Sequence, residues 1–270
     1  MTFNPVSSDP FEHYFYKRAE VADKMALAGH VVDARILATA SLDALAEIWL
    51  HDFPDIKKKL QSELGGKVPA SIRLARFLKQ FAVGDARVSK VAVICFAEDW
   101  KKHRPQDTDI ANRLLNRRIS NNPHQMPSSY LDLSRDDLAQ ECPELNSRSD
   151  LYALAEEYEY GAILYSFYRC PLVHVATHSK RTHGFARREE VMYYWSDDDD
   201  DSVTIGFGPN LATCWLRNVV SNYVLTCQQF GITPANYIDA GISHEDRFGA
   251  LWSRYNRRNV ASSRSSGTLN

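Results

Sequence analysis

The sequence LYALAEEYEYGAILYSFYR, residues 151–169 of the 270-residue chain, has the pattern of a long helix in a helical bundle. Asp150 precedes it and is a suitable N-cap, because its carboxylate can accept hydrogen bonds from the first free backbone N–H groups. Apolar residues recur three and four positions apart and therefore share one helix face. This face consists of Leu154, Tyr158, Gly161, Ile163, Leu164 and Phe167.

Segments on the N-terminal side of this one show the same spacing. Residues 9–53 are predicted to be helical, with Asp9 as the N-cap and Gly29 as the only interior helix-breaking residue. Further helices are expected over about residues 69–82 and from near Val88 onward. The N-terminal third of the chain is thus predicted to supply several helices of the bundle.

The pattern changes on the C-terminal side. Val191–Trp195 and Val203–Phe207 are short runs rich in β-branched and aromatic residues, and they predict a β-hairpin. The aspartates at 197–201 lack the spaced ligands of a calcium loop, so we expect a solvated turn rather than a cation site. A strong helix is expected over residues 210–230 and a shorter one over residues 243–255.

The predicted fold class is therefore mainly α, a helical bundle with a small β-hairpin insert. We expect a single domain over residues 1–255. Residues 103–149 are polar and contain four prolines, which favours an insertion with short helices at most. Residues 256–270 are rich in serine and arginine and are expected to be disordered.

Composition excludes several classes of protein. The net charge of -2 gives no overall attraction to nucleic acid, so any basic surface must be local. The five cysteines are widely spaced and odd in number, which argues against a disulfide framework and a thiolate metal site. The N-terminus lacks the pattern of a signal peptide and no segment reaches transmembrane length, so we expect a cytoplasmic protein without a membrane span. The sequence has no Gly-rich phosphate loop, and no cofactor is expected.

The segment that carries chemistry begins where the predicted helix of residues 151–169 ends. Pro171 lacks a backbone donor and disfavours helix at Cys170, so the helix is expected to end near Arg169 and a new turn to begin at Pro171. On an unbroken α-helix Arg169 and His174 would point about 140° apart, whereas a kink would let both face one pocket. An imidazole can take a proton from a ribose 2′-hydroxyl while a guanidinium binds the phosphate, and this chemistry requires RNA.

The motif R-x4-H formed by Arg169 and His174, at the end of an aromatic-rich helix, resembles the signature of the HEPN ribonuclease superfamily. The resemblance extends to the helical segment at 34–49, the lead-in at 164–168 and the hairpin followed by a helix at 211–230. Residues 33–83 and 150–230 form the part of the chain that is similar to bacterial members of that superfamily. Cys170 occupies a position where the family usually has a polar residue.

The resemblance implies a helical bundle that forms a homodimer in which two R-x4-H motifs meet in one cleft. It implies a metal-independent endoribonuclease in a toxin, defence or RNA-processing role, with an antitoxin or regulatory partner as a further possibility. Arg169 would bind the phosphate, and His174 would act as the general acid or base.

A local cluster of positive charge follows the motif. From Arg169 to Arg188 the chain has five basic residues and no acidic one, which suits an RNA backbone. An ordinary solvated loop is the alternative, and Glu189 and Glu190 dilute the charge. The candidates for positioning RNA are Lys180, Arg181, Arg187 and Arg188.

Other interpretations of the same segment stay open. The main one is a catalytically silent HEPN module that binds a nucleotide or a partner protein, which Cys170 favours. A nucleophilic Cys170 is another, and Tyr165 and Tyr168 would either stack on RNA bases or belong to the core or a dimer interface. A metal site is a further alternative, although it lacks a carboxylate ligand nearby in sequence; its ligands would be His174, His178 and His183.

Overall fold

The structure is a computed structural model that describes residues 9–119, 129–175, 179–184, 186–195 and 203–234; the side chains of residues 147, 149 and 173–175 lie outside the description. Residues 1–232 form one compact unit and residues 233–270 a second, and every described helix and strand belongs to the first. The predicted acidic turn at 197–201, the predicted helix at 243–255 and the predicted tail at 256–270 lie outside the described residues.

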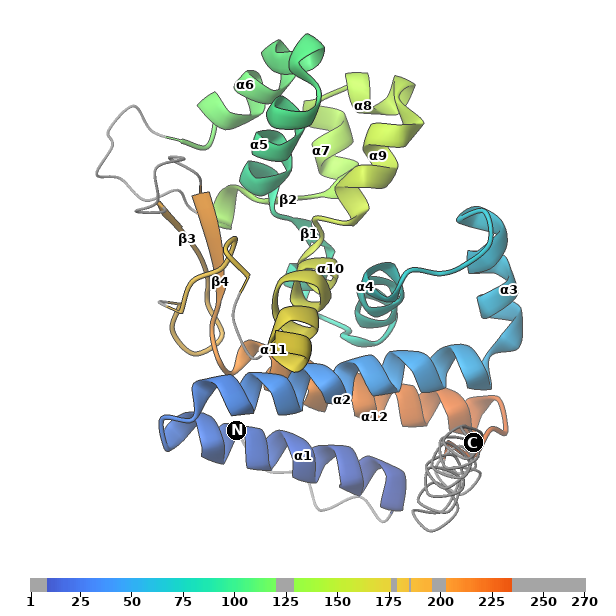
Figure 1. Cartoon of the computed structure of the whole chain (residues 1–270). Coiled ribbons are helices and arrows are strands. Elements are labelled where there is room, and N and C mark those ends of the chain that lie inside the picture. Colours follow the sequence, from blue (N-terminus) through green and yellow to red (C-terminus); the bar gives the residue numbers. More distant parts are fainter. Residues whose placement is uncertain (1–8, 120–128, 176–178, 185, 196–202, 235–270) are drawn as a thin grey trace, which may run out of the picture. The chain divides into compact units, whose positions relative to one another are not determined.

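Three long helices pack on one another at the base of the first unit: α1 (Pro10–Leu27), α2 (Val31–Asp52) and α12 (Leu211–Gln229) (Figure 1). The helical segment expected over residues 9–53 consists of two helices, α1 and α2, separated at Gly29, the predicted helix-breaking residue. The chain turns at Gly29, whose φ of 88° is readily adopted only by glycine, and α2 runs back along α1. The helix predicted over residues 210–230 is confirmed as α12.

The next layer contains α3 (Pro54–Glu63) and α4 (Ala70–Phe81), the second of which confirms the helix expected at 69–82. Helix α4 packs against α10 (Tyr160–Ile163) at very short range. A Cβ atom at Gly161 would lie 2.8 Å from the Cα atom of Ala75. The two helix backbones can therefore approach so closely only because position 161 has no side chain.

The helix expected over residues 151–169 is divided in the structure. It consists of α9 (Ser149–Glu156), α10 and the π-helix η4 (Leu164–Arg169), which α11 (Cys170–Val175) continues. The division occurs at residues 157–159, because the Tyr158 carbonyl accepts a hydrogen bond from the Ala92 N–H (2.8 Å) and Glu159 forms a β-bridge with Val91. A tertiary pairing thus interrupts a local helical pattern.

Pro171 does not end the helix as expected. Cys170 keeps helical dihedral angles (φ -65°, ψ -53°), and the chain stays helical from Leu164 to Val175. The wider π-helical turn comes directly before the first turn of α11, which contains Pro171. The N–H groups of a first helical turn have no acceptor within their own helix, so the missing N–H of the proline breaks no hydrogen bond of α11. Arg169 is the last residue of the π-helix.

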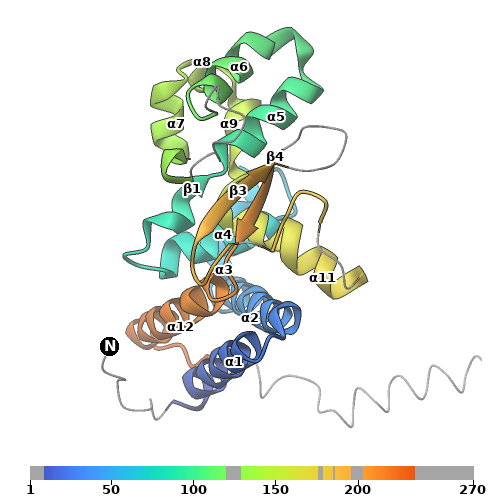
Figure 2. The same ribbon diagram turned by 90° about the vertical axis from the view of Figure 1, so that its left-hand side faces the viewer.

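A second hydrophobic core forms around α5 (Val93–His103), α6 (Thr108–Asn116), α7 (Arg135–Glu141), α8 (Glu144–Ser147) and α9 (Figure 2). The short helices expected within residues 103–149 are confirmed. They pack with residues before and after that range into one buried cluster that includes Phe96, Trp100, Leu114, Leu138 and Leu151. Helix α5 begins later than the helix expected near Val88, where the short 3-10 helix η1 (Ala86–Ser89) lies instead.

Two small antiparallel sheets complete the mainly α fold of the described residues. Strands β3 (Val191–Trp195) and β4 (Val203–Phe207) confirm the predicted hairpin, and its register pairs Val191 with Phe207. The other sheet, of β1 (Lys90–Val91) and β2 (Leu133–Ser134), was not expected from the sequence. Every residue of β4 is buried, so the hairpin belongs to the main core rather than to the periphery. The other short helices are η2 (Pro105–Asp107) and η3 (Ser129–Leu131).

Within the described part of the chain, every helix is too short or too polar to cross a membrane.

Candidate functional site

Arg169 is held in place by groups from two helices. Its Nη2 atom lies 2.9 Å from Oδ2 of Asp43 on α2, and its guanidinium lies over the ring of Tyr165, 5.4 Å from the ring centroid. The side chain of Asp43 is 10% exposed and that of Arg169 is 22% exposed. The guanidinium thus sits at the edge of the protein surface in a fixed orientation.

Asp43 also binds a second arginine. Arg73 on α4 donates a hydrogen bond from Nη2 to Oδ1 of Asp43 (2.8 Å) and forms an ion pair with Glu47 through its other terminal nitrogen. Each oxygen of Asp43 therefore binds a different guanidinium. Sequence reasoning missed Asp43 and Arg73, although a carboxylate on the apolar α2 between Leu42 and Leu45 was an available signal.

His174 lies on α11, on the same continuous helical path as Arg169. Its side chain lies outside the described residues. The expected meeting of Arg169 and His174 in one pocket therefore stays a prediction.

Four basic residues were expected to position RNA, and three of them are exposed: Lys180, Arg187 and Arg188. The loop that carries the two arginines is fixed to the start of α12. Asn210 donates its backbone N–H to the Arg188 carbonyl (2.8 Å), and a Cβ atom at Gly208 would lie 2.1 Å from that oxygen. Arg188 itself has a φ of 44°, in the left-handed region. The hydrogen bond to Asn210 therefore fixes the backbone position of Arg188.

Arg181 has a different environment from the other three cations. Its Nη1 atom forms an ion pair with Asp99 (2.8 Å), and its Nη2 atom lies 3.7 Å from Glu98 and donates to the Cys95 carbonyl (3.3 Å). These three partners all belong to α5. Arg181 thus ties the loop after α11 to α5, and its charge is already matched by carboxylates.

Tyr168 belongs to the protein core. It is fully buried, stacks on Phe207 (centroids 5.3 Å apart) and donates its hydroxyl hydrogen to the Ile205 carbonyl (3.1 Å), while the same hydroxyl accepts from the Phe207 N–H (2.8 Å). It therefore joins the helix to β4, and its buried ring is not available to stack on a ligand. Tyr165 is only partly buried and supports Arg169.

The alternative metal site receives no ligand set from the described residues, among which no group of three histidine, cysteine or acidic side chains gathers. The Nε2 atom of His183 lies 3.0 Å from the Met192 carbonyl, and burial lowers the pKa of this imidazole. The side chains of His174 and His178 are outside the description, so the full set of three stays untested. Cys170 is a half-buried thiol.

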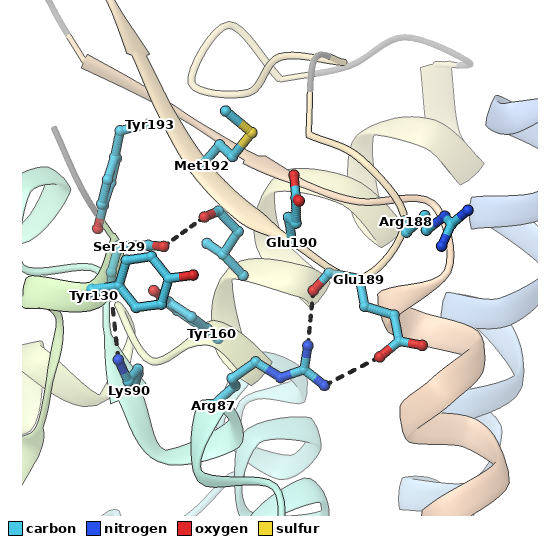
Figure 3. Close-up of a pocket in the computed structure, with 11 residues that line it drawn as sticks. Arg87, Lys90, Ser129, Tyr130, Tyr160, Arg188, Glu189, Glu190, Met192 and Tyr193 are labelled. Carbon is cyan, nitrogen blue, oxygen red and sulfur yellow. Dashed lines mark hydrogen bonds and ion pairs between the residues drawn. The ribbon is translucent and has the colours of Figure 1, made fainter. Parts of the chain in front are cut away.

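A cavity of about 690 Å³ opens beside β3, at a place that no sequence pattern indicated (Figure 3). Its walls come from η1 and β1, from η3, from the start of α10 and from the residues that lead into β3. The lining carries three cations, two carboxylates and three tyrosines. These are Arg87, Lys90, Arg188, Glu189, Glu190, Tyr130, Tyr160 and Tyr193, together with Ser129, Val191 and Met192.

Two of the tyrosines are fixed by a buried carboxylate. The hydroxyls of Tyr160 and Tyr193 each donate a hydrogen bond of 2.6 Å to Oδ2 of Asp132, and the Val93 N–H donates to Oδ1 (3.1 Å). Asp132 is 2% exposed. It therefore joins the start of α10, the middle of β3 and the first turn of α5 at one point.

The pH dependence of stability is expected to report on Asp132. Burial raises the pKa of its carboxyl from the ordinary 3.8 to about 6, although the three hydrogen bonds act in the other direction. The folded state therefore keeps this proton to higher pH than the unfolded state does. The free energy of unfolding should fall by about 2 to 3 kcal/mol as the pH rises through this window, from about pH 4 to about pH 6, and this loss should level off above it.

Other acidic groups also titrate, so the test compares urea unfolding of the parent with Asp132→Asn, which has no proton to lose at this position. The stability of the parent relative to the variant is expected to decrease across the window. Parallel pH profiles for the two proteins would show that the pKa of Asp132 is not raised.

Comparison of the chain with known protein families, with curated proteins and with solved structures found no match. Its function is therefore inferred from the residues of this chain.

Proposed function

We propose that the protein is a metal-independent endoribonuclease that acts as a homodimer, with Arg169 as the phosphate-binding residue and His174 as the general acid or base. The observation that carries the proposal is the attachment of Arg169. Its guanidinium is fixed by Asp43 and Tyr165 at the edge of the surface, on the same helical path as His174.

A fixed arginine is suited to phosphate chemistry. Only Nη2 of Arg169 forms an ion pair within the described residues, so Nη1 is left to donate to a phosphate oxygen. Because Asp43 and Tyr165 already restrict the side chain, little further entropy is lost when the phosphate binds. A guanidinium held in this way would stabilise the negative charge that develops on the phosphate oxygens during cleavage.

The chemical step uses the 2′-hydroxyl of the substrate as the nucleophile. His174 takes the hydroxyl proton, the 2′-oxygen attacks phosphorus, and the bond from phosphorus to the 5′-oxygen breaks. His174 of the partner subunit donates a proton to the leaving 5′-oxygen. The products are a 2′,3′-cyclic phosphate and a 5′-hydroxyl, and the need for one acid and one base is the reason for proposing a dimer.

RNA would be positioned by the exposed cations Lys180, Arg187 and Arg188. Arg181 does not belong to this set, because its guanidinium already forms an ion pair with Asp99. The biological setting that we propose is a toxin, defence or RNA-processing system.

A silent module of the same fold that binds a nucleotide or a partner protein is the second candidate. Two observations favour it. Cys170 occupies the position after Arg169 where the superfamily usually has a polar residue, and the cavity beside β3 offers space for a small ligand.

RNA cleavage is expected to persist in EDTA and to leave 2′,3′-cyclic phosphate ends, because the nucleophile belongs to the substrate and no metal-generated hydroxide is required. The measurement is mass analysis of the ends formed from a short RNA, with the same sequence in DNA as the control. Loss of cleavage in EDTA with recovery on addition of zinc would favour the histidine metal site. Complete lack of cleavage of a broad set of RNAs would favour the silent module.

A further inference from the structure

The cavity beside β3 has the size and lining of a small-molecule site. Its volume of about 690 Å³ lies within the range of roughly 300–1,000 Å³ that is usual for ligand pockets. Its lining includes Arg188, one of the cations proposed to position RNA, but neither Arg169 nor Lys180. The test of this site therefore uses Lys90 and Tyr130, which have no part in the proposed nuclease.

Lys90 is a half-buried cation in the lining of this cavity. It lies on β1, and its backbone is fixed by the pairing of Lys90 with Ser134. Within the described ranges its ammonium group contacts only the Ser129 carbonyl, at 3.4 Å, and has no carboxylate partner. A half-buried ammonium group that lines a cavity without a counter-ion favours an anionic ligand.

Arg87 forms a rigid wall of the cavity, and its charge is matched by Asp85 and by Glu189, whose Oε2 atom lies 3.7 Å from Nη2. Asp85 binds its Nε and Nη2 atoms (2.8 and 2.6 Å), and its Nη1 atom donates to the Glu189 carbonyl (2.8 Å). In Figure 3 the guanidinium reaches across the lower side of the cavity towards Glu189. Arg87 therefore shapes the cavity, and Lys90 is left as the half-buried cation available to a phosphate.

The other groups of the lining suit the rest of a nucleotide. Tyr130 is 90% exposed, and in Figure 3 its ring lies above Lys90 at one side of the cavity, where a planar base can stack on it. Glu190 is exposed on the lining, and its carboxylate can accept hydrogen bonds from sugar hydroxyls but would repel a bare phosphate ion. A half-buried cation, an exposed aromatic ring and an exposed carboxylate together favour a nucleoside phosphate over inorganic phosphate.

We propose that the cavity binds a nucleoside monophosphate, with the phosphate on Lys90, the base against Tyr130 and the ribose hydroxyls directed to Glu190. Tyr160 and Tyr193, which Asp132 fixes, form the rigid inner wall.

Isothermal titration calorimetry of the full chain with AMP tests this site, with adenosine and inorganic phosphate as partial ligands. AMP is expected to bind saturably, and each partial ligand at least about tenfold more weakly, because each lacks one set of contacts. Lys90→Gln should weaken AMP binding by about tenfold or more. Lys102→Gln, which removes an exposed charge on α5 outside the cavity, should bind AMP like the parent.

Lys90 makes few contacts, so Lys90→Gln is expected to fold, and circular dichroism confirms this. Tyr130→Ala provides a second variant at an exposed position and should also weaken AMP binding while leaving the binding of inorganic phosphate unchanged. The proposal is overturned if AMP does not bind, if Lys90→Gln binds AMP as tightly as the parent, or if inorganic phosphate binds as tightly as AMP. RNA cleavage is measured separately: cleavage without AMP binding overturns only this site, whereas AMP binding without RNA cleavage favours the silent module.

Discussion

Replacement of His174 by alanine is expected to reduce the rate of RNA cleavage by at least about 10²-fold, because the imidazole both accepts the 2′-hydroxyl proton and, from the other subunit, protonates the leaving oxygen. RNA binding should be nearly unchanged, since the cations proposed to contact the phosphate backbone remain. The measurement is single-turnover cleavage combined with a binding titration. Circular dichroism confirms that the variant is folded.

Arg169→Lys separates a requirement for shape from a requirement for charge. Lysine keeps the positive charge but lacks the planar guanidinium, so the ion pair with Asp43 and the contact with the Tyr165 ring would both change. Cleavage should fall severely, which simple electrostatic attraction of RNA would not explain.

The matched control replaces the exposed Arg187 and Arg188 together by alanine. This change should weaken RNA binding and reduce its dependence on salt, with a smaller effect on the rate of the bound complex. If folded His174→Ala cuts RNA as fast as the parent, His174 is not the catalyst and the silent module becomes the better interpretation.

Replacement of Asp132 by alanine is expected to lower the free energy of unfolding by about 4 kcal/mol near pH 5, more than either of the other two stability variants described below. It leaves the hydroxyls of Tyr160 and Tyr193 and the N–H of Val93 buried without their acceptor, and each such group costs about 1–3 kcal/mol. The loss should be about 1 kcal/mol smaller near pH 7, because the parent then carries a buried negative charge whose pKa is raised to about 6. Urea unfolding at the two pH values measures both effects.

Two further variants test the cause of this loss. Tyr193→Phe removes one donor and leaves Asp132 with two, so its cost should be only about 1 kcal/mol. Asp109→Ala removes an exposed carboxylate on α6 and should have little effect. A loss for Asp132→Ala no greater than that for Asp109→Ala would show that the three hydrogen bonds do not stabilise the fold.

Local sequence patterns predicted those elements whose structure depends on their own residues. The hairpin of β3 and β4 has the predicted bounds, and α4 and α12 lie where the spacing of apolar residues placed them. In these segments residue type and periodicity agree with the tertiary environment. Position 29 shows the limit of such reasoning, since a glycine within a helical pattern does not reveal whether the helix continues or turns back.

The interruption at residues 157–159 had no local signal. The Tyr158 carbonyl pairs with the N–H of Ala92, and Glu159 bridges to Val91, so the helical pattern yields to a partner that is distant in sequence. Residues 103–149 were expected to form an insertion because they are polar and contain four prolines. Their apolar residues are sparse along the chain and form a core only together with α5 and α9.

For the candidate site, the sequence by itself determined the identity of the chemical groups: an arginine and a histidine five residues apart, followed by basic residues. Only the tertiary structure decided that Asp43 binds Arg169, that Arg181 is matched by Asp99, and that Lys90 lines a cavity. The physical reason is that ion pairs, buried hydrogen bonds and cavities depend on distances between residues far apart in the chain. Packing of the helices and the hairpin sets those distances, whereas sequence periodicity fixes only which face of each element is buried.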